Sequence, residues 1–103
     1  MAWQRAAGAD EVAEGLPLGV SVAGYDICLL KWHGNVYAID DICSHAEAQL
    51  SQGEQDGPIL QCPRHGGRFD IRTGKAVHYP AFSPVATYPT RVEDGIVFVD
   101  VAP

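Results

Sequence analysis

The amino-acid sequence predicts an all-β protein, an antiparallel sandwich or barrel. Short runs rich in β-branched and aromatic residues recur along the chain, and helical periodicity is nearly absent. Glycine, proline, asparagine and aspartate divide these runs at short intervals, as is typical of antiparallel sandwiches and barrels. Turn-forming pairs stand between neighbouring runs, and Ala23-Gly24 and Asp94-Gly95 are the clearest hairpin signals.

The expected strands follow one another with short connections. Only residues 10–14 favour a turn of helix, and a loop that contains Pro80 and Pro84 precedes the last two strands. Residues 41–52 and 62–67 lose the strand alternation, so we expect loops that a β scaffold presents at one end. Strands are expected at residues 3–6, 18–22, 25–32, 36–39, 58–61, 68–71, 75–77, 87–92 and 96–101.

The 103 residues have the length of a single domain, residues 1–103. Hydrophobic residues make up 47% of the chain, which predicts a globular rather than a disordered protein. Acidic residues outnumber basic ones by 13 to 7, and the net charge of −6 argues against binding to nucleic acid or anionic membranes. The same charge suits a protein that docks transiently on other proteins.

No apolar run has the length of a signal peptide or a membrane span, so a cytoplasmic location is expected. The three cysteines agree with a reducing compartment. Two of them stand in metal-ligand patterns, and Cys28 stands in an apolar run where a small, buried hydrophobic role is expected. No pair therefore remains to form a disulfide.

Two short arms carry the strongest chemical signal in the sequence. Cys43-Ser44-His45 is followed, after 16 residues, by Cys62-Pro63-Arg64-His65, and each arm offers one thiolate and one imidazole. A binuclear iron–sulfur cluster with two cysteines on one iron and two histidines on the other fits this donor set. The residues Gly66 and Gly67 follow the second arm, and their missing Cβ atoms allow the backbone to approach a cluster closely.

Zinc is the alternative metal, because two cysteines and two histidines are also a zinc-binding set. Zinc fingers, however, usually pair cysteine with cysteine and histidine with histidine in each arm. The mixed arms favour the iron–sulfur cluster, and a zinc-held interaction module stays open as an alternative.

The other histidines predict no catalytic site. His33 lies in an expected turn and is predicted to be solvated, and a packing or solvent role is expected for His78. Neither belongs to a pattern of nucleophile and base, so no hydrolytic site is expected.

Basic residues gather in and after the second arm, where most of them are expected to be simply solvated. The sharper hypothesis is that Arg64 helps to dock an acidic face of a redox partner, and that Glu47 acts similarly with the opposite charge. The group comprises Arg64, Arg68, Arg72 and Lys75.

The sequence resembles the Rieske-type ferredoxins of bacterial aromatic-ring oxygenase systems over essentially its whole length. The resemblance implies that Cys43 and Cys62 bind a buried iron, and that His45 and His65 bind the outer iron. It also implies a fold of three stacked antiparallel sheets, with a cluster-binding subdomain at about residues 41–82 inserted in a sandwich-like or barrel-like base. The residues that carry it are Cys43-Ser44-His45, Cys62-Pro63-Arg64-His65-Gly66-Gly67, residues 69–75, Pro80-Ala81 and residues 88–95.

The resemblance implies an electron carrier and not an enzyme. A soluble, monomeric protein with one 2Fe-2S cluster would take electrons from a NAD(P)H-dependent reductase and pass them singly to a terminal ring-hydroxylating oxygenase. Both partners would dock transiently near His45 and His65. The alternative within related proteins is a small subunit of an assimilatory nitrite reductase. A complete oxygenase is excluded because the chain is too short to hold a separate catalytic iron.

The resemblance further implies a low reduction potential. Respiratory Rieske proteins carry an extra cysteine in each arm, and they have Ser and Tyr where this chain has Gly67 and Phe69. Those hydroxyl groups donate hydrogen bonds to sulfur and favour the reduced state, and Gly67 and Phe69 cannot do so. We therefore expect a potential nearer to about −150 mV than to about +300 mV.

Overall fold

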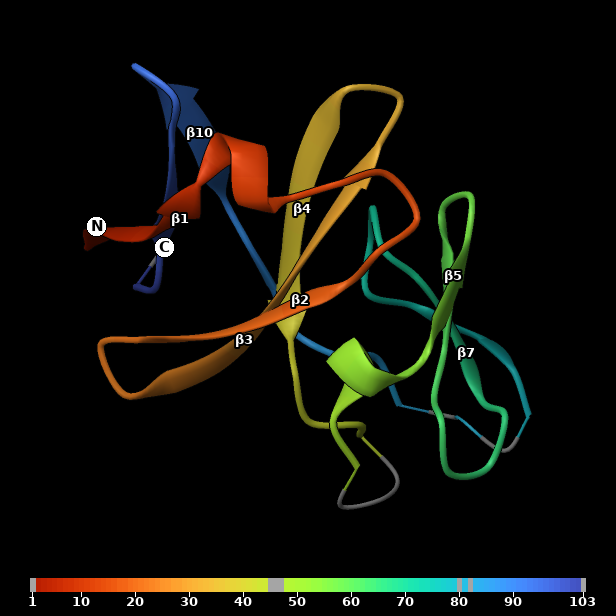
Figure 1. The fold of residues 1–103 in the computed structure, drawn as a ribbon. Helices are drawn as coiled ribbons and strands as arrows, with labels where there is room; N and C mark the ends of the chain where they lie inside the picture. The colour runs from red at the N-terminus through yellow and green to blue at the C-terminus, as the bar shows by residue number, and fades with distance from the viewer. Residues whose placement is uncertain (1, 45–47, 80, 82, 103) are drawn as a thin grey trace.

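The computed structural model describes residues 2–44, 48–79, 81 and 83–102. It is built from three antiparallel sheets, which confirms the all-β prediction (Figure 1). The first sheet has the order β1 (Trp3–Gly8), β11 (Ile96–Asp100) and β10 (Thr90–Glu93). The second has the order β2 (Leu18–Val22), β3 (Tyr25–Trp32), β4 (Asn35–Asp40) and β9 (Thr87–Tyr88). The third has the order β5 (Glu54–Asp56), β6 (Ile59–Gln61), β7 (Arg68–Asp70) and β8 (Ala76–His78).

Two short 3-10 turns, η1 (Ala9–Glu11) and η2 (Leu50–Gln52), interrupt the strands. The expected turn of helix at residues 10–14 was therefore placed too late and has the tighter 3-10 form. The expected strand at 87–92 is divided into β9 and β10, because Pro89 has no N–H group to donate to a ladder. Strand β5 was not predicted at all, since Glu54, Gln55 and Asp56 show no alternation of polar and apolar residues.

The predicted hairpins are present, and their turns have an unusual feature. Ala23, His33 and Asp94 all have positive φ angles of 50–51°, and each is followed by a glycine with positive φ. Two consecutive residues with positive φ define the type I′ turn, whose twist matches that of the flanking strands. These turns fix the register of β2 with β3, of β3 with β4, and of β10 with β11.

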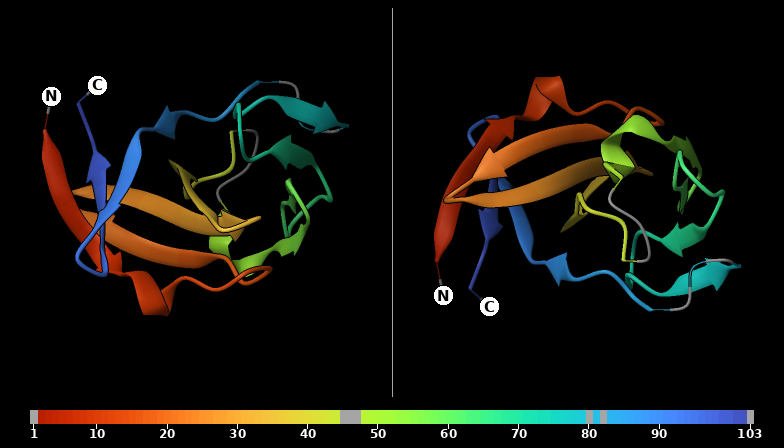
Figure 2. Two further views of the ribbon diagram at one scale, coloured as in Figure 1. Left: turned by 90° about the horizontal axis from the view of Figure 1, so that it is seen from above. Right: turned by 90° about the horizontal axis from the view of Figure 1, so that it is seen from below.

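Two hydrophobic cores lie on opposite sides of the molecule. The base core contains Val12, Ile27 and Leu29, packed against Val97 and Val99 of β11. The second core lies between the central sheet and the third sheet, and Figure 2 shows that third sheet at the end farthest from both termini. Its buried residues are Cys28, Leu30, Ile39, Cys43, Leu50, Leu60, Cys62, Phe69, Ile71, Ala81 and Val85.

Strand β3 connects the two cores. Alternation along β3 sends Ile27 and Leu29 into the base core and Cys28 and Leu30 into the second core. Residues 27–30 of β3 are thus buried on both faces of the central sheet, which lies between the two cores. The boundaries of a cluster-binding subdomain at about residues 41–82 stay a prediction, although β5 to β8 all fall within them.

The carboxylate of Asp100 joins the two ends of the chain. It is buried, and its Oδ1 accepts hydrogen bonds from the N–H groups of Ala2 at 2.8 Å and Ala102 at 3.0 Å. The bond from Ala2, followed by that from Ala102, lowers the pKa of Asp100 against the opposing effect of burial. Its stabilising effect is therefore fully present above the ordinary pKa of about 3.9 and is lost as pH falls through the lowered value.

We expect Asp100→Asn to lower the free energy of unfolding at pH 7 and to leave it nearly unchanged at the acid end. Urea unfolding between acid and neutral pH measures this, with the unaltered protein as reference. A variant that loses the same stability at every pH would show that the charge of Asp100 contributes nothing.

Within the described part of the chain, no helix is both long and apolar enough to cross a membrane.

Candidate metal centre

Both predicted arms are loops that their own backbone hydrogen bonds close. The N–H group of Cys43 donates to the carbonyl oxygen of Ala48 at 2.9 Å, so the two ends of the first arm are joined by a hydrogen bond. The N–H group of Cys62 donates to the carbonyl oxygen of Gly67 at 2.7 Å, which closes the second arm in the same way. Each cysteine therefore stands at the first position of a closed loop, where its backbone is fixed.

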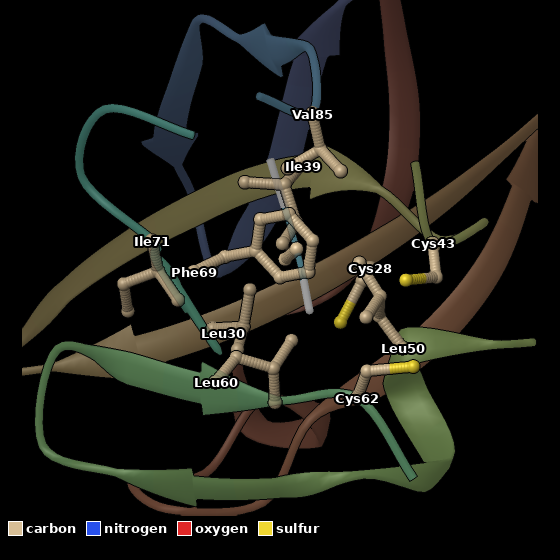
Figure 3. Packing of buried hydrophobic residues seen from close by; sticks show 11 residues of the cluster. Cys28, Leu30, Ile39, Cys43, Leu50, Leu60, Cys62, Phe69, Ile71 and Val85 are labelled. Atoms are coloured by element: carbon tan, nitrogen blue, oxygen red, sulfur yellow. The ribbon is translucent and has the colours of Figure 1, made fainter. Parts of the chain in front are cut away.

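The two cysteine side chains are buried in the second core. Cys43 is 5% exposed and Cys62 is 0% exposed. Figure 3 shows the Cys43 and Cys62 side chains at one end of this core, and Cys28 belongs to the same core. His65, three residues after Cys62, is exposed. Sulfur donors thus lie inside the protein, and an imidazole lies at the surface of the same loop.

His45 and Glu47 lie outside the described residues, so the structure places three of the four predicted ligands. Their donor types match a 2Fe-2S cluster with mixed ligands, because two sulfur atoms are buried and one arm ends in a surface histidine. Among the described residues, the structure does not bring three ligand side chains together at one point.

Gly66 gives the second arm its tight shape. Its φ angle of +75° lies in the left-handed region, which a residue with a Cβ adopts only at a cost. Its N–H group donates to the carbonyl oxygen of Cys62 at 3.2 Å, so the turn folds back onto the cysteine. Gly66 therefore has a local role in the turn, and the close approach of this backbone to a cluster stays a prediction.

The loop that leads from the third sheet back to the base supports the first arm. The hydroxyl group of Ser44 donates to the carbonyl oxygen of Ser83 at 2.7 Å. Val85 is buried in the second core, and its N–H group donates to the carbonyl oxygen of Gly74 at 2.9 Å. This loop therefore connects the first arm to the turn that follows β7.

Sequence reasoning missed Asp41, which stands two residues before Cys43. It is 2% exposed, and its two carboxylate oxygens accept hydrogen bonds from the N–H group of Ser51 at 2.7 Å and from the Ser51 hydroxyl group at 2.9 Å. The signal that could have found it is weak, because an Asp40-Asp41 pair after a strand usually indicates an exposed turn.

The arginines in and after the second arm have different surroundings. Arg72 forms an ion pair with Asp70 at 2.8 Å and lies over the ring of Trp32 at 5.1 Å. The side-chain hydrogen bond from Arg72 lowers the pKa of Asp70. The Nε atom of Arg68 donates to the side-chain oxygen of Gln61 at 3.2 Å. Arg64 is exposed and takes part in no ion pair with another described residue, so its charge is available to a partner.

The remaining predictions for single residues are consistent with the structure. Cys28 is fully buried, and burial followed by the charge of Asp41 raises the pKa of its thiol far above the usual range, so it stays neutral. His33 is exposed in its turn, where its ring stacks on Trp32 at 4.2 Å. His78 is exposed at the end of β8, opposite Arg68 in the ladder.

Comparison with known proteins gives a consistent result. Residues 2–89 match the model of the Rieske [2Fe-2S] domain. The chain is 38% identical to the ferredoxin component of the naphthalene 1,2-dioxygenase system of Pseudomonas putida, over 97% of this chain and 96% of that protein.

Solved structures agree with the sequence match. The Sphingomonas yanoikuyae B1 ferredoxin superposes with a TM-score of 0.90 at 39% identity, covering 93% of this chain and 95% of that one. A chain in the complex of reduced oxygenase and oxidised ferredoxin of carbazole 1,9a-dioxygenase superposes with a TM-score of 0.88 at 31% identity, covering 94% of this chain and 91% of that one. The chain therefore belongs to the Rieske [2Fe-2S] domain family, and it is a Rieske-type ferredoxin with one 2Fe-2S cluster.

Proposed function

We propose that Cys43 and Cys62 bind the inner iron of the cluster and that His45 and His65 bind the outer iron. The observation that carries this assignment is the contrast within the second arm between fully buried Cys62 and exposed His65. A cluster held in this way supplies reversible one-electron chemistry at a potential raised by its neutral imidazole ligands. The chain contributes the fixed arms, the exclusion of water from the sulfur side, and a histidine edge that a partner can approach.

This arrangement supports the function of an electron carrier that transforms no organic substrate itself. The carrier takes electrons from a NAD(P)H-dependent reductase and delivers them singly to a terminal ring-hydroxylating oxygenase. The relatives named as ferredoxin components of dioxygenase systems support it, as does the likeness to a ferredoxin of an oxygenase complex. They favour this function over the small subunit of a nitrite reductase, and the cluster family favours it over a zinc-held module.

We expect both partners to dock transiently near His45 and His65, because exposed His65 would offer a partner a ligand edge at the surface. A cytoplasmic, monomeric protein agrees with this role, since a carrier must leave one partner before it meets the next. Such encounters bury little surface and depend on complementary charge more than on apolar area.

The experiment that tests this function follows single electron transfers. The reduced protein is mixed anaerobically with the oxidised terminal oxygenase of the naphthalene or the carbazole system, and its reoxidation is followed by its visible spectrum. We expect rapid reoxidation with at least one of them, and slower transfer at higher salt. Failure with both oxygenases, by a protein that holds its cluster and is reduced by dithionite, would contradict the assignment.

Arg64→Ala is expected to slow this transfer by roughly two- to five-fold at low salt, and little at high salt, because an exposed charge acts mainly through screened attraction. Arg5→Ala is the matched control, since Arg5 is also exposed but lies on β1, at the end of the molecule away from the arms (Figure 2). Equal effects of the two substitutions would remove any specific role of Arg64 in docking.

A further inference from the structure

We propose that Asp41 is a positioning residue for electron transfer, which holds the first arm in place and lowers the reduction potential of the cluster through its buried negative charge. The inference rests on the proposed ligand set, because it requires Cys43 and Cys62 to bind the inner iron. It adds a second cause of a low potential to the absence of hydroxyl groups at Gly67 and Phe69.

Hydrogen bonds hold both oxygen atoms of the Asp41 carboxyl group. Oδ1 accepts the hydrogen bond from the backbone N–H group of Ser51 at 2.7 Å. Oδ2 accepts those from the Ser51 hydroxyl group at 2.9 Å and from the Gln49 side-chain amide at 3.5 Å. Both oxygens therefore accept hydrogen bonds, although the side chain is almost completely removed from water. Burial of a charge is costly unless such bonds compensate it, so these contacts make the charge possible.

The backbone of Asp41 lies at the base of the first arm, where the chain enters the loop and leaves it again. Its carbonyl oxygen accepts a hydrogen bond from the N–H group of Leu50 at 2.6 Å, and its own N–H group donates to the carbonyl oxygen of Asp26 at 3.0 Å. Ile42 and Gln49, the next pair along the loop, form an isolated antiparallel β-bridge. The backbone hydrogen bond from Cys43 to Ala48 follows it. The side chain and the backbone of Asp41 thus both act on the loop that directs Cys43.

Strand β2 leaves room for the carboxylate. Gly19 lies over it, and a Cβ atom at this position would stand 2.6 Å from the hydroxyl oxygen of Ser51 and 3.0 Å from Oδ2 of Asp41. Any other residue would have to displace the pair. The missing Cβ atom of Gly19 therefore leaves room for the carboxylate and the Ser51 hydroxyl group next to β2.

Asp41 stands two residues before Cys43, close in the chain to a proposed ligand. It contributes, after burial, to the raised pKa of Cys28, whose side chain lies in the same core as Cys43 and Cys62 (Figure 3). A fixed negative charge opposes the addition of an electron nearby, and the effect is strong where the dielectric constant is low. Because both groups are buried, dissolved salt screens this effect much less than it screens surface charges.

The test is the midpoint potential of Asp41→Asn, which keeps the size of the side chain and removes its charge. We expect a potential above that of the unaltered protein, the same shift at low and high salt, and an unchanged EPR signal and iron content. Asp100→Asn is the matched control, because Asp100 is equally buried at 2% exposure but lies at the far end of the base. It is expected to leave the potential unchanged.

Two further variants separate charge from structure. Ser51→Ala removes a hydrogen bond and keeps the charge, so it is expected to lower stability without raising the potential. Gln49→Lys leaves Asp41 in place and brings an ammonium group next to its carboxylate, because Gln49 is an exposed neighbour of Oδ2. This substitution is expected to raise the potential, and it serves as the test if Asp41→Asn takes up the cluster poorly.

An unchanged potential in both Asp41→Asn and Gln49→Lys, with a normal EPR signal, would overturn the role of Asp41 and leave the ligand set intact. An equal upward shift in Ser51→Ala would also overturn it, because the effect would then be structural. A wrong ligand set would instead appear in the unaltered protein, as a signal without the features of histidine ligation.

Discussion

Cys62→Ala is expected to abolish the cluster, leaving a colourless protein with less than about one tenth of the iron of the unaltered chain. The physical reason is that iron in such clusters needs anionic thiolate ligands, and Cys62 is one of only two that the inner iron would have. Metal binding also contributes to folding free energy, so the melting temperature should fall together with the iron content. Iron analysis, the visible spectrum and a thermal melt measure this.

Cys28→Ala is the matched control, because Cys28 is equally buried in the same core and loses the same atom. Its packing loss is about 1 kcal/mol, and the cluster is expected to stay. If Cys28→Ala lost the cluster and Cys62→Ala kept it, the proposed ligand set would be wrong.

Gly74→Ala is expected to lower the free energy of unfolding by about 2–5 kcal/mol, the sum of a strained backbone and an overlap. Gly74 has a φ angle of +78°, and a Cβ atom there would overlap the backbone carbonyl oxygen of Val85. Because Val85 and Ser83 belong to the loop that holds Ser44, the substitution should also slow the incorporation of the cluster. Urea unfolding and the rate of cluster reconstitution measure the two effects.

Gly24→Ala separates the backbone strain from the steric overlap. Gly24 also has a positive φ angle, of +85°, but a Cβ atom would meet nothing within 4 Å. Its expected loss is about 1–2 kcal/mol, the backbone term alone. Equal losses at the two positions would show that the contact between Gly74 and the Val85 loop does not constrain the site.

The sequence predicted most strands because their signals are local. Strands β2 and β3 have the expected bounds, since alternating apolar residues end at Ala23-Gly24, a pair that forms the expected turn. Strand β5 could not be predicted, because Glu54–Asp56 is polar and becomes a strand only by pairing with β6 after the turn at Gly57. Its structure depends on a partner and not on its own residues.

The candidate site also combines features that the sequence makes visible with features that it does not. The four proposed ligands stand out in the sequence because thiolate and imidazole are rare donor types and their spacing is specific, and the ligand set itself stays a proposal. Asp41 could not be predicted, since its burial depends on Ser51 beside it and on the missing Cβ of Gly19 above it. These contacts join segments far apart in the chain, and neither periodicity nor a motif records them.

The central claim is that this chain carries a 2Fe-2S cluster with two cysteine and two histidine ligands. The measurement that tests it most directly is EPR of the anaerobically purified protein after reduction with dithionite, beside a visible spectrum before reduction. We predict a red-brown protein with an anisotropic signal of low average g value, as histidine ligation of one iron produces. A colourless, EPR-silent protein that contains zinc would contradict the claim.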